Sequence, residues 1–291
     1  MRKILYALII LALLSSSAGS LEKQVIRLGM LTKLNSTEEQ FTETWIKTFA
    51  PHNEILEVIV KFYDTLTSMQ MALNSREINQ MVLPDFTADY VMKAANEYTP
   101  ALVLHSKGTG LAFGFRADNE ELRDKFNEAL RHLRDNWTLS VLEGIYIASH
   151  NIDDPEPVKF AKFDDAETIR VAVTGDLPPI DLIAADGTPS GFNTAVLAEI
   201  GAYLKKNIQL VNIEAGARNA ALASGRVDVV FWYEIDKSSQ VQADVPDGII
   251  LSEPYYEWDK FIHIKRKTKE SASSSGWKIF NSDFWGLYFN E

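Results

Sequence analysis

The chain has 291 residues, of which 46% are hydrophobic and 24% charged, with a formal net charge of −11. This composition is typical of a globular protein long enough for one large or two modest domains. The acidity argues against a nucleic-acid partner, because phosphate contacts require a basic face. The absence of cysteine excludes disulfides and thiolate chemistry, and the five histidines show no metal-ligand spacing. We therefore expect no metal and no cofactor.

The N-terminal residues predict a secretory signal peptide over residues 1–20. Two basic residues precede an apolar run from Ile4 to Leu14, and small polar residues follow it. The apolar run is too short to span a bilayer comfortably. An uncleaved anchor is the alternative, and no cysteine is present to carry a lipid. We expect a periplasmic protein released by cleavage near Leu21.

The first half alternates between strand and helix patterns. Apolar runs predict strands at 25–31, 55–62 and 78–83. Ser36, with Glu39 three residues later, forms a capping-box pattern for a first helix, and further helices are expected at 65–74 and 86–98. A strand at 110–116 and helices within 119–146 follow. Strands that alternate with helices predict a parallel sheet covered by helices.

The second half repeats this alternation. Strands are expected at 169–173, 208–211, 226–231 and 261–264, with helices after 193 and at 219–224. Asn193 or Thr194 is the expected N-cap of the first of these helices, and Gly225 ends the second. Between the halves, residues 151–167 are rich in Asp, Glu and Pro, which is typical of a linker.

Several short blocks of the second half occur in a recognisable order. They are GDLPP at 175–179, GFN at 191–193, ALASGRVDVV at 221–230 and SEPYY at 252–256. This set resembles the first lobe of bacterial periplasmic solute-binding proteins of family 3, the type that carries polar amino acids. In the first half, residues 25–41, 71–85 and 88–91 resemble the second lobe of that family, and residues 110–146 resemble its C-terminal element. The resemblance implies an α/β fold of two lobes with a cleft between them (type II), and no enzymatic activity.

The two halves stand in inverted order, which indicates a circular permutation; a tandem of two truncated copies is the alternative. The resemblance divides the chain into a lobe-two-like part at 21–108, a hinge strand and returning helices at 109–150, the linker, and a lobe-one-like part at 168–264. The tail, 265–291, combines a serine-rich stretch with aromatic residues. It either contacts a membrane component or packs on lobe two, and we favour packing because exposed aromatic patches are costly.

The resemblance also implies ligand-binding positions. Asp85 follows a strand and matches the carboxylate that takes the ligand ammonium, although it is equally suited to cap the next helix. Asp176 and Ile180 belong to the lip of lobe one. The family usually carries an aromatic residue at the position of Ile180, so this chain departs from the pattern there.

The loop expected after residue 231 is the other side of the predicted site. Trp232 and Tyr233 form either an aromatic wall or core, and Glu234 or Asp236 meets a cationic group or solvent. The arginine that grips the ligand carboxylate in the family is missing from this segment. Arg218 and Lys237 are the candidates to replace it.

These observations predict an exported protein that captures a small polar solute, amino-acid-like or an amine, for ABC-type uptake or for sensing. Its partners would be that solute and an ABC permease or a membrane sensor. A periplasmic enzyme similar to cyclohexadienyl dehydratase, or an interaction protein with a degenerate cleft, are the alternatives. We find no motif of a known catalytic class in the chain.

Overall fold

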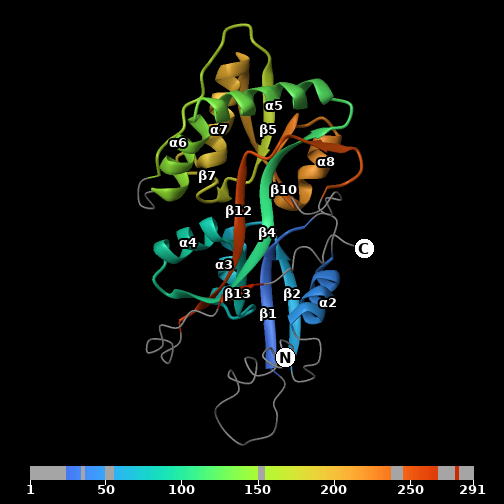
Figure 1. The fold of residues 1–291 in the computed structure, drawn as a ribbon, viewed down its shortest axis with the longest axis vertical. Coiled ribbons are helices and arrows are strands. Elements are labelled where there is room, and N and C mark those ends of the chain that lie inside the picture. The colour runs from blue at the N-terminus through green and yellow to red at the C-terminus, as the bar shows by residue number, and fades with distance from the viewer. Residues whose placement is uncertain are drawn as a thin grey trace, which may run out of the picture.

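The computed structural model describes residues 24–33, 37–49, 56–149, 155–236, 245–267 and 279–281. This part of the chain forms two α/β lobes stacked along the long axis and joined by strands that pass from one to the other (Figure 1). The predicted two-lobe α/β fold is confirmed. The expected signal peptide, Lys237, part of the linker and most of the tail lie outside the described residues. In the described ranges, no helix has the length and apolarity needed to cross a membrane.

Lobe two, as we name the N-terminal lobe, has strand order β2-β1-β3-β12-β4. Its strands are β1 (Gln24–Leu31), β2 (Leu56–Tyr63), β3 (Gln80–Pro84), β12 (Tyr256–Arg266) and β4 (Tyr98–Arg116). β1 pairs with β2 and β3 in parallel, whereas β12 lies antiparallel between β3 and β4. Its helices are α2 (Glu38–Phe49), α3 (Leu66–Asn74) and α4 (Asp85–Ala94).

Two details of lobe two differ from the sequence prediction. The capping box of α2 is formed by Thr37 and Gln40, whose side chains each accept the backbone N–H of the other residue. The predicted helix over 86–98 ends at Ala94, and Tyr98 begins β4 instead. Tyr98 pairs with Arg266 of β12, so a strand distant in sequence overrides the local helical pattern.

Lobe one has the strand order β9-β5-β10-β4-β11, so in both lobes the first three strands lie in the order second, first, third. Its own strands are β5 (Thr168–Val173), β9 (Asn207–Asn212), β10 (Val229–Asp236) and β11 (Ile249–Leu251). Its helices are α5 (Glu120–Asp135), α6 (Thr138–Glu143) with a π-helical turn to Ala148, α7 (Phe192–Leu204), a 3₁₀ turn (Ala215–Ala217) and α8 (Arg218–Ala223). A small hairpin sheet contains β6 (Asp176–Leu177), β7 (Asp181–Ile183) and β8 (Pro189–Ser190).

Three expectations for lobe one were wrong. α7 follows Gly191, whose φ of 105° suits glycine, and its second and third residues, Asn193 and Thr194, are buried rather than capping. β10 continues to Asp236 instead of ending at residue 231, because it pairs antiparallel with β4. Strand β12, which runs through both lobes, was expected over residues 261–264 and spans Tyr256–Arg266, because it pairs with β4 along its length.

β4 and β12 pass through both lobes and make one continuous ten-stranded sheet of the described strands. At the level between the lobes, the β12–β4 pairing shifts register between Trp258 and Lys260. Gly108 of β4, at the same level, has a φ of 106°. Irregular pairing bends a sheet locally, so the strands that join the lobes bend at this level.

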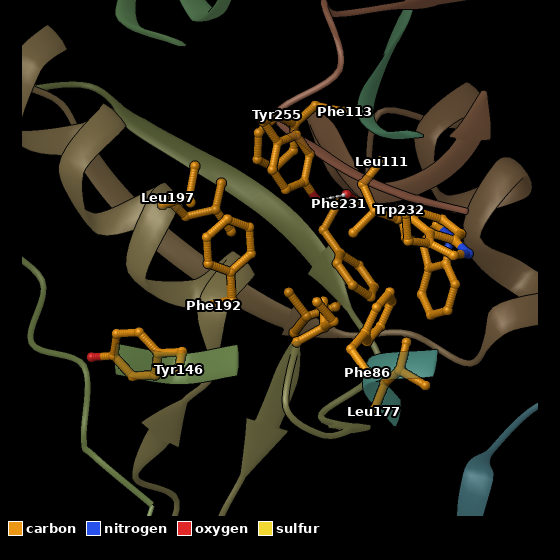
Figure 2. Close-up of a cluster of buried hydrophobic side chains, with 14 of the residues drawn as sticks. Phe86, Leu111, Phe113, Tyr146, Leu177, Phe192, Leu197, Phe231, Trp232 and Tyr255 are labelled. Carbon is orange, nitrogen blue, oxygen red and sulfur yellow. Dashed lines mark hydrogen bonds between the residues drawn. The ribbon is translucent and has the colours of Figure 1, made fainter. Parts of the chain in front are cut away.

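One of the core clusters contains apolar side chains of both lobes. It includes Leu28 and Val82 of lobe two, Val171 of lobe one, and Phe86 and Leu177 between them. Figure 2 shows Phe86, from the start of α4, beside Leu177 and below Trp232. The interior therefore continues from one lobe into the other.

The start of the tail lies on lobe two. Lys267 donates from its backbone N to Glu97 O at 2.8 Å and from Nζ to Asn96 Oδ1 at 2.8 Å. β13 (Ile279–Asn281) pairs in parallel with residues 103–105 of β4. These described parts pack on lobe two, as favoured from the sequence.

Candidate functional site

The candidate site is the cleft where strand ends of the two lobes face each other. The ends of β1 and β2 bring residues 31–33 and 64–66 from lobe two, and lobe one brings Thr174, Asp176, Leu177, Arg218, Trp232 and Glu234. Ligand sites in α/β folds form at the carboxyl ends of strands. The cavity that remains between these residues is about 20 Å³, which holds about one water molecule.

Asp176 of lobe one binds the first turn of α3 in lobe two. Its carboxylate accepts the backbone N–H of Thr67 at 2.9 Å and the Thr67 hydroxyl at 3.0 Å. The first N–H groups of a helix have no intrahelical acceptor, and the helix dipole favours an anion there. A carboxylate from one lobe thus satisfies donors of the other.

Two further contacts cross the cleft. Lys33 Nζ lies 2.6 Å from Glu234 Oε2, and the two side chains are only 10% and 12% exposed. Asp64 Oδ1 accepts the N–H of Gly216 at 3.0 Å and, within its own lobe, the Thr32 hydroxyl at 2.7 Å. Glu234 was expected either to meet a cation or to be a solvated loop charge. The structure places it on a strand with a lysine partner.

Arg218 lies in the cleft with Trp232 and against the ring of Tyr233. Arg218 is buried, lines the cleft, and holds its guanidinium carbon 5.3 Å from the Tyr233 ring centre. Tyr233 is buried away from the cleft and donates its hydroxyl to Asn219 Oδ1. Trp232 lines the cleft. In this closed form, Trp232 and Arg218 are therefore cleft residues and Tyr233 supports Arg218.

Asp85 and Ile180 lie apart from the cleft cavity. Asp85 is the first residue of α4, and its Oδ1 accepts the adjacent Phe86 N–H at 2.9 Å. Burial raises the pKa of Asp85, while the Phe86 hydrogen bond and the charge of Lys260 oppose this shift. Ile180 is fully buried in the core cluster. Neither side chain lines the small cavity in the closed form.

A buried carboxylate holds the lip that carries Asp176. Asp181 is fully buried, and its Oδ2 accepts Thr174 N at 2.8 Å, Thr174 Oγ1 at 3.1 Å and Gly175 N at 2.7 Å. Its Oδ1 has no hydrogen-bond partner among the residues that the structure describes. Burial is the main cause that raises the pKa of Asp181 to about 6, with a smaller contribution from the charge of Asp176.

Sequence reasoning missed Lys33, Asp64 and Thr67. Each follows the end of a parallel strand or begins the helix after it, so the strand-end rule would have identified all three. The predicted site residues follow β3 or belong to lobe one, and none was predicted at the ends of β1 and β2. Among the described residues, no group of three or more His, Asp or Glu is arranged to hold a metal.

Residues 169–271 match the family described as bacterial extracellular solute-binding proteins, family 3. No curated protein matches the chain. Among solved structures, the chain is similar to the ligand-binding component of an ABC-type import system from Staphylococcus aureus with zinc bound. The two are 11% identical with a TM-score of 0.44, and the alignment covers 84% of this chain and 66% of the other.

Two other structures have a comparable likeness. The alkanesulfonate-binding protein SsuA from Xanthomonas axonopodis pv. citri bound to MOPS is 10% identical, with a TM-score of 0.44 and coverage of 86% of this chain and 68% of that chain. An ancestral arginine-binding protein bound to arginine is 12% identical, with a TM-score of 0.41 and coverage of 85% and 87%. At these scores the likenesses identify neither a ligand nor a partner. By sequence, residues 169–271 of this chain are similar to the bacterial extracellular solute-binding proteins, family 3.

Proposed function

We propose that this protein is an extracytoplasmic solute-binding module that captures a small polar solute between its two lobes. The observation that carries the proposal is the convergence of charged residues of both lobes on one cleft, namely Lys33, Asp64, Asp176, Arg218 and Glu234. Such a set offers both cationic and anionic partners to a small solute. The family match of lobe one supports a binding role rather than catalysis.

The solute we propose carries an ammonium group, a carboxylate, or both. Asp64, Asp176 and Glu234 would accept an amine, and Lys33 or Arg218 would pair with a carboxylate. Asp85 would join this set if rotation of the lobes exposes it, because a half-buried carboxylate is stabilised by an ammonium partner. Lys237 and Ile180 remain predicted ligand positions of the open form.

We also infer that the inverted order of the lobes is a circular permutation. The helices α5 and α6, which follow lobe two in the chain, pack on α7 of lobe one. Each lobe has one complete strand set, which supports permutation over two truncated copies. Export through a cleaved signal peptide, and delivery of the solute to an ABC permease or a membrane sensor, belong to the same proposal.

A thermal-shift screen over amino acids, polyamines, dicarboxylates and cyclic acids tests the proposal. The protein should first be unfolded, dialysed and refolded, so that no co-purified solute remains. A solute at about a hundred times its Kd adds about 2.7 kcal/mol of stability, which gives a readily measured rise in the unfolding temperature.

The matched variants are Arg218→Gln, in the cleft, and Arg226→Gln, which is not among the residues lining the cleft. The first should abolish the shift of a carboxylate-bearing solute, and the second should leave it. Equal shifts in both variants would remove Arg218 from the site. No shift with any solute class, in the native protein and in a variant with an opened cleft, would refute solute capture.

A further inference from the structure

We propose that the two lobes close on each other without a solute, held by three carboxylate contacts, and that a solute binds only after displacing them. The contacts are Asp176 on Thr67, Glu234 on Lys33 and Asp64 on Gly216, and we call them the latch. The inference rests on the proposed function, because it concerns how the same cleft is regulated.

Each latch contact joins opposite lobes and follows the same chemistry. A carboxylate of one lobe meets an N–H group or an ammonium group of the other, at 2.6 to 3.0 Å. Two of the carboxylates belong to lobe one and one to lobe two, so the contacts are not one accidental cluster on a single loop. Charge-assisted hydrogen bonds are the strongest class that two rigid lobes can form at a cleft.

Apolar packing supports the closed position. Phe86, on the first turn of α4 in lobe two, lies edge-on to Tyr256 and Trp258 at ring-centre distances of 5.3 and 5.4 Å. Leu177 of the lobe-one lip is buried in the same cluster (Figure 2). Opening the lobes would expose part of this surface to water, which opposes opening.

The space beside the latch is too small for a solute, so a solute at this position and the latch exclude each other. The cavity beside the latch is about 20 Å³, whereas small-molecule sites are usually at least about 300 Å³. The donors that would bind a solute anion, Lys33 Nζ and the Thr67 N–H, are already bonded to Glu234 and Asp176. A solute must therefore compete with the protein's own carboxylates. Its apparent affinity equals its affinity for the open form multiplied by the fraction of molecules that are open.

The test measures the distance between the lobes without any solute. Because the chain has no cysteine, Met71→Cys on α3 and Ala202→Cys on α7 give one specific pair for spin labels; both positions are exposed. Double electron–electron resonance on refolded protein then gives the populations of short and long distances. The latch variant is Asp64→Ala/Asp176→Ala/Glu234→Ala, and the matched control is Asp164→Ala/Asp186→Ala/Glu199→Ala, three exposed carboxylates of lobe one.

We expect the solute-free native protein and the control to show mainly the short distance. The latch variant should lower the ratio of closed to open molecules by at least about tenfold, since a single hydrogen bond to a charged group shifts an equilibrium by roughly that factor. Mainly long distances in the solute-free native protein would overturn the proposal, as would a latch variant identical to the control. If the triple variant fails to fold, Asp176→Ala alone provides the same comparison.

This outcome is independent of whether a solute exists, because no solute is present. A closed native protein that binds nothing in the screen would retain the latch and refute solute capture if Thr67→Pro, which removes the donor to Asp176 in the first turn of α3 and keeps all the site carboxylates, also binds nothing. An open native protein that closes on a solute would refute the latch and retain solute capture.

Discussion

Replacement of Asp181 by asparagine should remove a large part of the pH dependence of stability. The carboxylate is fully buried, and burial raises its pKa to about 6 from the ordinary value of 3.8. One pKa unit corresponds to about 1.4 kcal/mol, so ionised Asp181 costs the folded state about 3 kcal/mol. A raised folded-state pKa means that the stabilising contribution is complete below about pH 3.8 and is lost as the pH rises through about 6. Asparagine does not ionise, so it lacks this loss.

The assay is urea unfolding of the native protein and Asp181→Asn at several pH values between 4 and 7. The free-energy difference between the two should shift by about 2 to 3 kcal/mol in favour of the variant as the pH rises, because other titrating groups cancel in that difference. The amide oxygen of the variant side chain can still accept hydrogen bonds from Thr174 and Gly175. The amide NH₂ group then takes the place of Oδ1, which has no partner among the described residues. Asp186→Asn, at an exposed turn where a Thr188 N–H bond lowers the pKa, is the control and should shift the other way or not at all. A difference that stays constant with pH would refute the burial argument.

Two other predictions follow from buried positions. His263 is buried, and burial lowers its pKa to about 3, so the free energy of unfolding should fall as the pH drops below about 6.5. In urea unfolding, His263→Gln should weaken this loss of stability at acid pH. The same loss in the variant and the native protein would contradict the prediction. In Gly114→Ala the new methyl group would lie 2.1 Å from Cε2 of buried Tyr233, and the variant should lose about 1–3 kcal/mol or more of folding stability. In the control Gly144→Ala the methyl group meets no described atom within 4 Å, and the variant should be as stable as the native protein or slightly more stable. Equal unfolding temperatures for the two variants would refute the packing argument.

Much of the fold could be predicted from local pattern. Parallel strands such as β1 and β5 are apolar runs bounded by turns, and Gly225, with a φ of 70°, ends α8 as glycine usually does. The errors occur where distant pairing decides the structure. Tyr98 joins a strand because it pairs with β12. Strand β10 extends past residue 231 because it pairs with β4. No short window of sequence contains that information.

The candidate site could be predicted only in part. The strand-end rule and the family resemblance pointed to Asp176, Arg218, Trp232 and Glu234, which do line the cleft. The partners across the cleft could not be paired from sequence, because Asp176 and Thr67 are separated by more than a hundred positions. Which carboxylates meet which donors depends on how far the lobes rotate, and rotation leaves no pattern in the chain.

The position of β12 has a consequence for the order in which the chain can fold. This strand is among the last described segments, yet it lies in the middle of the lobe-two sheet, between β3 and β4. During synthesis, β3 and β4 emerge long before the strand that joins them, so their facing edges stay unpaired until almost the whole chain has appeared. Lobe two, although first in sequence, can therefore complete its sheet only when residues 256–266 have emerged, and until then the unpaired edges of β3 and β4 are open to aggregation.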